Sequence, residues 1–238
     1  QIYFYSESGH LVSVEAQDGL QNWVYPFDGT TLRLLAPFRV QYDALWFGDL
    51  FGTLYAMEKS SQVTFNTVPT GEAIVSTPFV VEYHVLVQTP TALICVRPDF
   101  IDAGDGRRRL RPSTDPQRTH DALWSFPLVS ESTASDFRRG GTTMQDIMSH
   151  AERRSIEPVM KGRAWFYLLE TMRDGRRFLF RVEAETGKPD AEVDPETNET
   201  RLRRFEVTAF PHILVTTDEQ NRTIYFGTHE GYIFGCSE

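Results

Sequence analysis

The chain begins with a short apolar run that leads into a segment in which side chains alternate with a period of two. The run at residues 2–5 is aromatic and β-branched, which predicts a strand buried on both faces. Residues 6–9 end on glycine and predict a turn, and residues 11–16 predict a strand with one face in the core. Asp18-Gly19 then predicts a hairpin turn into a third strand, which carries Trp23.

This succession of strands and turns recurs along the chain. A shift of 43 residues places Gly52 at the position of Gly9 and Ala56 at the position of Ser13. A last copy at residues 224–235 aligns with the first without gaps, and two weaker copies begin near residues 85 and 165. We therefore interpret the chain as about five copies of one unit.

A period of about 40 residues with several short strands in each unit predicts an all-β fold, a β-propeller with four-stranded blades. A small twisted sheet cannot cover its own apolar faces, so neighbouring blades stack and share a core. We expect one domain over residues 1–238 with incomplete first and last blades, so the chain is either a segment of a longer one or an open ring. The expected blades are residues 1–26, 35–69, 74–128, 156–207 and 209–238, with an insertion at 98–155.

The first copy also resembles a known repeat. Its small residue, acid, turn glycine and tryptophan are similar to the repeat of quinoprotein-like (PQQ-like) propellers, with Asp18 in place of the usual threonine. In that family the tryptophan docks against the next blade, which implies a structural docking role for Trp23 and for Trp124 of the third copy. The residues that match are Ser13, Glu15, Gly19 and Trp23, and in the fourth copy Glu183, Thr186 and Gly187.

The insertion interrupts the repeats. Its first part, to residue 120, has the composition of a solvated loop and includes a basic run at residues 107–111. Further on, Thr143 predicts a helix cap, and we expect the helix to close with Arg154 in its last turn. The helix either packs on its own propeller or presents a face to a protein partner. The residues of that candidate partner face are Met144, Ile147 and Met148.

Composition narrows the classes of partner. The net charge is −9, which argues against general binding of nucleic acid. No apolar run approaches the roughly 20 residues of a membrane-spanning helix. The two cysteines, Cys95 and Cys236, lie in return strands of blades that are not adjacent, so we expect two unpaired buried thiols.

We find no catalytic constellation in the sequence. The six histidines are scattered, no metal-ligand spacing occurs, and neither a nucleophile elbow nor a phosphate loop is present. We therefore expect no enzyme activity, no cofactor and no metal. A ring of carboxylates at one face, serving a metal or substrate, is a minor alternative to solvated turns; its members are Glu7, Asp49, Glu170 and Glu230.

The function that we expect is a non-catalytic interaction or scaffold propeller, periplasmic or extracellular, that binds protein partners. One alternative is a luminal unfolded-protein sensor that forms a homodimer through open sheet edges. It is based on a weaker resemblance of residues 2–23 and 224–235 to endoplasmic-reticulum stress-sensor kinases, and on glycosylation sequons at Asn198 and Asn221. Another alternative is a fragment of a quinone-dependent dehydrogenase.

Overall fold

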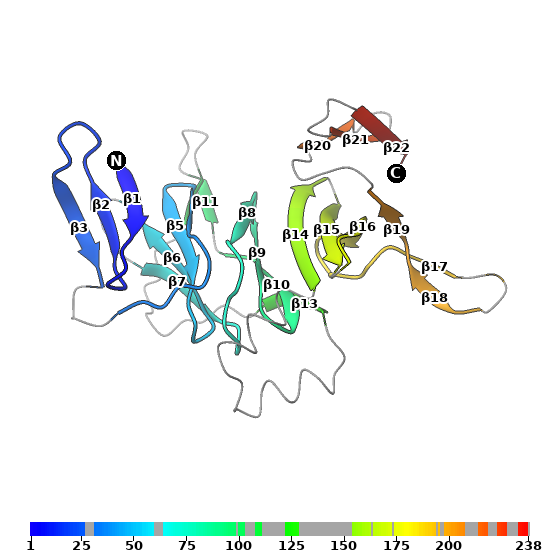
Figure 1. The fold of residues 1–238 in the computed structure, drawn as a ribbon, viewed down its shortest axis with the longest axis horizontal. Coiled ribbons are helices and arrows are strands. Elements are labelled where there is room, and N and C mark those ends of the chain that lie inside the picture. Colours follow the sequence, from blue (N-terminus) through cyan, green and yellow to red (C-terminus); the bar gives the residue numbers. More distant parts are fainter. Residues whose placement is uncertain are drawn as a thin grey trace. The chain divides into compact units, whose positions relative to one another are not determined.

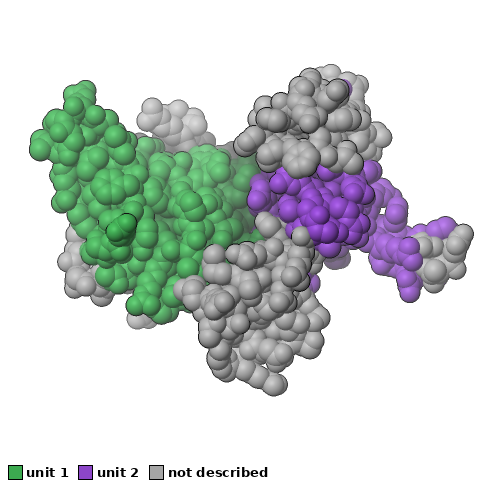
Figure 2. All heavy atoms as spheres, viewed as in Figure 1, with its two compact units in different colours: residues 1–89, 96–122 green, residues 90–95, 123–238 purple. Residues whose placement is uncertain are grey.

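In the computed structural model every regular element is a β-strand, among the residues it describes. These are residues 1–26, 31–59, 64–98, 100–102, 108–110, 122–128, 154–162, 164–172, 174–193, 195, 198–207, 214–218, 223–227 and 233–237. They form two compact units, residues 1–89 with 96–122 and residues 90–95 with 123–238 (Figure 2). None of the described segments is a helix long and apolar enough to cross a membrane.

Two antiparallel sheets follow one another at the start of the first unit (Figure 1). Blade 1 is three-stranded and consists of β1 (Ile2–Tyr5), β2 (Leu11–Val14) and β3 (Gln21–Tyr25), in that order. Blade 2 is four-stranded and consists of β4 (Arg39–Gln41), β5 (Ala44–Gly48), β6 (Thr53–Glu58) and β7 (Thr64–Pro69). Each is a simple up-and-down meander, as propeller blades are.

Three further sheets repeat this meander. Blade 3 contains β8 (Phe79–Val81), β9 (His84–Gln88), β10 (Ala92–Val96) and β13 (Ala122–Pro127). Blade 4 contains β14 (Arg154–Lys161), β15 (Trp165–Met172), β16 (Arg177–Glu183) and β19 (Arg204–Glu206). Blade 5 contains β20 (Leu214–Asp218), β21 (Thr223–Gly227) and β22 (Ile233–Ser237). The predicted class, an all-β propeller fold with shortened first and last blades, is confirmed.

The 43-residue shift between the first two copies holds at the level of strand register. In blade 1, Ser13 pairs with Tyr3 on one side and Trp23 on the other. In blade 2, Ala56 pairs with Trp46 and Asn66 in the same way. Both sheets carry a β-bulge directly after this small residue. The two blades are therefore the same structure built from different side chains.

One hydrophobic cluster of the first unit lies between blades 1 and 2. Its fully buried members are Leu11 and Trp23 of blade 1 and Leu45, Phe47 and Met57 of blade 2. Phe47 stacks on Tyr55 with ring centroids 5.0 Å apart, and its edge meets Tyr25. Sheet-on-sheet packing of this kind buries one face of each blade.

The prediction that residues 2–5 are buried on both faces is wrong. Ile2 is 51% exposed and Phe4 is 44% exposed, whereas β5, the matching strand of blade 2, is buried throughout. The physical reason is position, because β1 is the edge strand of its sheet and only one of that sheet's faces meets blade 2.

The insertion differs from expectation where it is described. Two strands, β11 (Phe100–Asp102) and β12 (Arg108–Leu110), form a hairpin inside the part expected to be a solvated loop. The register sets Asp102 opposite Arg108, so part of the basic run lies in a strand. Arg154 begins β14, opposite Met172, and does not end a helix. Strand pairing with β15 overrides the local helical pattern there. The candidate face at Met144, Ile147 and Met148 lies outside the described residues.

A second small hairpin branches from blade 4. It joins β17 (Ala191–Val193) and β18 (Thr200–Leu202), in register from Ala191 opposite Leu202. Asn198, in the connection, has a positive φ of 56°. The other sequon, Asn221, lies outside the described residues. Of the two cysteines, Cys95 is buried, as expected, and the side chain of Cys236 is not among those described.

Candidate functional site

The two tryptophans expected to dock blades make the same contact in different parts of the chain. The Trp23 indole Nε1 donates a hydrogen bond to the Lys59 carbonyl oxygen of blade 2 at 3.1 Å. The Trp124 Nε1 donates to the Ala184 carbonyl oxygen of blade 4 at 2.8 Å. Both acceptors directly follow the repeat's acidic residue, Glu58 or Glu183, and both indoles are buried. The carbonyl of the residue after the repeat's acid therefore accepts the indole hydrogen bond in two separate pairs of blades.

Trp124 lies on a turn of blade 4, residues 183–188, which we call its seat. The Gly187 amide donates to the Glu183 carbonyl at 2.8 Å, and the Lys188 amide donates to the Thr186 hydroxyl at 3.2 Å. Gly187 has a φ of +68°, and a Cβ there would lie 2.5 Å from Cδ2 of the Trp124 ring. Glycine is required at this point both for its backbone conformation and for the close approach of the indole.

A second well-defined local structure is the turn between β5 and β6. The Asp49 carboxylate accepts hydrogen bonds at Oδ1 from the Phe51 amide at 3.0 Å and the Thr53 amide at 2.7 Å. Its Oδ2 accepts from the Tyr55 hydroxyl at 3.0 Å. Asp49 is 4% exposed, so its charge is held by these donors rather than by water. The Asp49 carboxylate therefore stabilises the turn.

The turn is also tied to the segment that follows β7. Gly52 has a φ of +83°, and its carbonyl accepts bonds from the Thr70 amide at 2.6 Å and the Thr70 hydroxyl at 2.9 Å. A Cβ on Gly52 would lie 2.5 Å from the Glu72 carbonyl oxygen, so the two backbones are in contact. The turn is therefore anchored from both sides.

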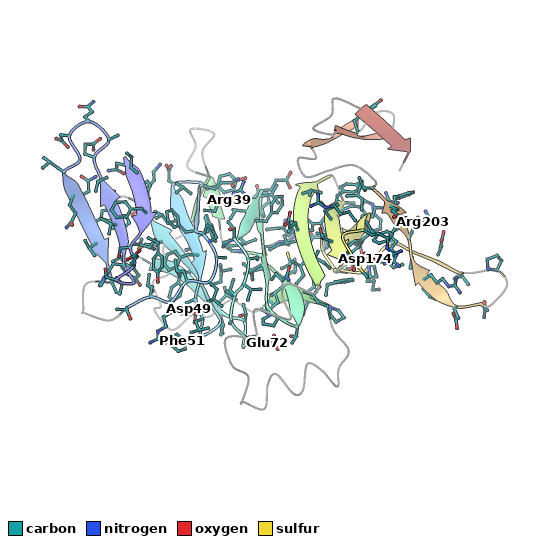
Figure 3. The ribbon with its side chains drawn as sticks, viewed as in Figure 1. Arg39, Asp49, Phe51, Glu72, Asp174 and Arg203 are labelled. Carbon is teal, nitrogen blue, oxygen red and sulfur yellow. The ribbon has the colours of Figure 1, made fainter. Side chains whose placement is uncertain are left out.

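Phe51 stands at the tip of this anchored turn and is 73% exposed. Figure 3 shows Phe51 close to Asp49, at the lower edge of the view, where Glu72 also lies. The equivalent tips of blades 1 and 4 follow the same hydrogen-bond pattern, and they carry Ser8 and Asp174 before the glycine. The turn itself does not need an aromatic residue, so Phe51 is a surface feature added to a common scaffold.

The carboxylates that the sequence offers as a ring, a minor alternative, have different surroundings where they are described. Glu170 lies within strand β15, opposite Phe178, rather than in a turn, and its Oε2 is 3.5 Å from Nη1 of Arg204. Asp49 is buried in the turn described above, and Glu7 is exposed. Glu230 lies outside the described residues. In the part of the chain that is described, no three His, Cys, Asp or Glu side chains gather as metal ligands.

Sequence reasoning missed Phe51 as a candidate residue. The signal was present, because the residue before each turn glycine can be compared between copies: Ser8, Phe51 and Asp174. Only one of the three is apolar. Comparing these three positions requires knowing which glycine is the turn glycine of each copy. In the fourth copy this is Gly175, and only the observed pairing of β15 with β16 identifies it.

No protein-family model matches the sequence, and no curated protein matches it. Solved structures do. BamB from Moraxella catarrhalis is 13% identical with a TM-score of 0.49, over 99% of this chain and 54% of that one. Quinohemoprotein alcohol dehydrogenase ADHIIG from Pseudomonas putida HK5 is 12% identical (TM-score 0.46; 99% and 40%). The Cps50 (Swd1) β-propeller domain from Myceliophteria thermophila is 9% identical (0.43; 99% and 64%).

The chain thus spans about half the length of the first structures it matches. All of these TM-scores lie below 0.5, so the assignment of blades rests on this chain's own strand pairing. The weaker resemblance to stress-sensor kinases finds no support in these comparisons.

Two glycines provide a matched test of tryptophan docking. Gly19 of blade 1 occupies the repeat position of Gly187 and has a similar φ of +72°, but a Cβ there would meet nothing within 4 Å. We expect Gly19→Ala to cost about 1–2 kcal/mol of unfolding free energy for the backbone strain alone. Gly187→Ala adds the clash with Trp124, about 1–3 kcal/mol more. Urea titrations measure both values, and equal losses would contradict the docking contact.

Tyr55 provides a test of the anchored turn. Burial, and then the neighbouring Asp49 charge, raise the pKa of Tyr55 from 10.0 to about 12. A raised folded-state pKa means that this contribution to stability is complete below pH 10 and is lost as the pH rises towards 12. We expect the unfolding free energy to fall less steeply over that interval in Tyr55→Phe than in the parent chain. Parallel curves in denaturant titrations would show that Tyr55 is not coupled to folding.

Proposed function

We propose that the chain acts as a non-catalytic protein-interaction propeller, a scaffold that binds protein partners. The observation that carries this proposal is Phe51, an aromatic side chain 73% exposed on a turn whose backbone is fixed. Aromatic residues presented on ordered backbone are typical binding hot spots, because little conformational entropy is lost when they are buried.

The energetics favour a binding role for Phe51 over a folding role. Burying a phenylalanine side chain contributes about 1.5–3 kcal/mol, and this side chain leaves most of that unused in the isolated chain. The polar Ser8 and Asp174 serve the same turn position in other blades, so folding does not require the aromatic ring. The unused burial is available to a partner.

The Asp49 network adds preorganisation. Three donors hold its carboxylate, and Thr70 holds the neighbouring Gly52 carbonyl. A partner that covers Phe51 therefore meets a tip already in its bound shape, which is the condition for binding without a large ordering cost. A periplasmic or extracellular setting, which the repeat resemblance implies, is part of this proposal.

Photo-cross-linking at the tip tests the proposal. A photoreactive phenylalanine analogue placed at position 51 of the full chain should yield adducts of a few discrete masses in native extract. Placed at the equivalent position 8 or 174, the same analogue should not. Phe51→Asp, which copies the blade 4 tip, should abolish capture of the partner so identified while leaving the unfolding free energy within about 0.5 kcal/mol of the parent.

A uniform smear of adducts from all three positions would contradict a specific surface at Phe51. Titration with pyrroloquinoline quinone and Ca²⁺ distinguishes this proposal from the enzymatic alternative, a fragment of a quinone-dependent dehydrogenase. A saturable spectral shift at stoichiometric quinone would overturn the non-catalytic assignment.

A further inference from the structure

Blade 1 has two largely apolar faces, and within the described part of the first unit only one of them packs against another sheet. The cross-strand register places Tyr3, Ser13 and Trp23 on the face that packs against blade 2. The opposite face is mostly apolar, with Gln21, opposite Val14, as a polar member. Two of its apolar side chains are strongly exposed: Ile2 at 51% and Phe4 at 44%. We call this opposite face of blade 1 the open face; its apolar residues are Ile2, Phe4, Val12, Val14 and Val24.

Blade 2 shows what the open face is built for. Leu45, Phe47 and Met57 occupy the register positions of Ile2, Phe4 and Val14, one repeat later. All three are fully buried, because blade 1 covers them with Leu11 and Trp23. The same pattern of apolar side chains is thus a blade–blade interface in one copy and uncovered in the other.

A turn at the border of the open face matches the seat of Trp124. In blade 1 the Gly19 amide donates to the Glu15 carbonyl at 3.0 Å and the Leu20 amide donates to Asp18 Oδ1 at 3.0 Å. In blade 4 the corresponding amides of Gly187 and Lys188 donate to Glu183 and Thr186. Asp18 therefore closes the turn in the way that threonine does, and the seat is already formed.

This seat is empty. A Cβ on Gly19 would meet nothing within 4 Å, whereas the one on Gly187 would strike the Trp124 ring. The Ala16 carbonyl occupies the repeat position of the Lys59 and Ala184 carbonyls, which accept the two indole hydrogen bonds. Among the described residues, no turn or side-chain hydrogen bond reaches the Ala16 carbonyl oxygen.

We infer that the open face binds a further propeller blade, not contained in residues 1–238, whose tryptophan donates to the Ala16 carbonyl and lies on Gly19. Such a blade covers the open face as blade 1 covers blade 2. The partner is therefore an apolar, tryptophan-bearing β-sheet. The open face does not include Phe51, which belongs to a different blade.

A second copy of this chain does not supply that tryptophan. The chain has four tryptophans. Trp23 and Trp124 are buried in their own docking contacts, and the Trp46 indole donates to the Gln41 carbonyl at 3.1 Å. The fourth, Trp165, packs under the Arg181 guanidinium with 4.6 Å between that group's Cζ and the ring centroid.

The experiment adds such a blade and measures whether the open face becomes covered. Because the repeat is 43 residues long, a second copy of residues 1–43 is placed directly before Gln1 of the full chain. Phe4→Cys in the original blade provides a thiol on the open face, and its labelling by a maleimide is followed by peptide mass spectrometry. A control chain carries Trp23→Ala in the added copy alone.

We expect the added blade to slow labelling at position 4 about tenfold, the factor that 1.4 kcal/mol of docking free energy produces. The Trp23→Ala control should restore the fast rate. An unchanged rate would show that the open face does not accept such a blade, and slow labelling in both extended chains would show that the Gly19 seat plays no part.

The chain without the added blade is labelled across a concentration series, with its mass followed by light scattering. We expect a monomer with fast labelling throughout. Dimerisation that protects position 4 would instead assign the open face to a second copy. None of these outcomes alters the cross-linking result expected at Phe51, so the inference and the proposed function fail separately.

Discussion

The structure depends on the fact that a small twisted sheet cannot cover its own apolar faces and is stabilised by the neighbouring sheets that pack on them. Neighbouring blades are joined by a tryptophan of one blade and a turn of the next. The indole ring lies on the glycine of that turn, and its Nε1 donates a hydrogen bond to the carbonyl three residues before the glycine. Trp124 shows the whole arrangement, with Gly187 beneath the ring and the Ala184 carbonyl as acceptor. One indole makes both the packing contact and the hydrogen bond, so a displacement of its ring weakens both.

The contact tolerates substitution where the physical role is kept. Asp18 accepts the turn hydrogen bond that Thr186 accepts in blade 4, since a carboxylate oxygen and a hydroxyl oxygen serve equally as acceptors. Blade 2 has Asn66 at the register position of Trp23 and keeps the same pairing and the same β-bulge. Strand register, rather than the tryptophan, is therefore the invariant part of the repeat.

Much of this could be predicted from the sequence because the repeats report on one another. The 43-residue shift carried over into strand pairing, and the turn glycines at positions 9 and 52 have positive φ, as their place before an alternating strand suggests. The exposure of Ile2 could not be predicted, because a strand's composition records that its faces are apolar but not whether a neighbour is present. That Glu170 lies inside a strand was also not visible in the sequence, because β15 extends to Met172, beyond the point where alternation can be seen.

The two candidate surfaces differ in the kind of binding that their physics supports. Phe51 is a single aromatic side chain on a fixed tip, with polar residues at the same position in other blades, which suits a small contact that forms and dissolves. The open face presents five apolar side chains in one plane beside a formed tryptophan seat, and its counterpart in blade 2 is a permanent core. Interfaces that resemble a divided core are of the obligate kind. A partner at the open face therefore completes the fold, whereas a partner at Phe51 binds to a fold that is already formed.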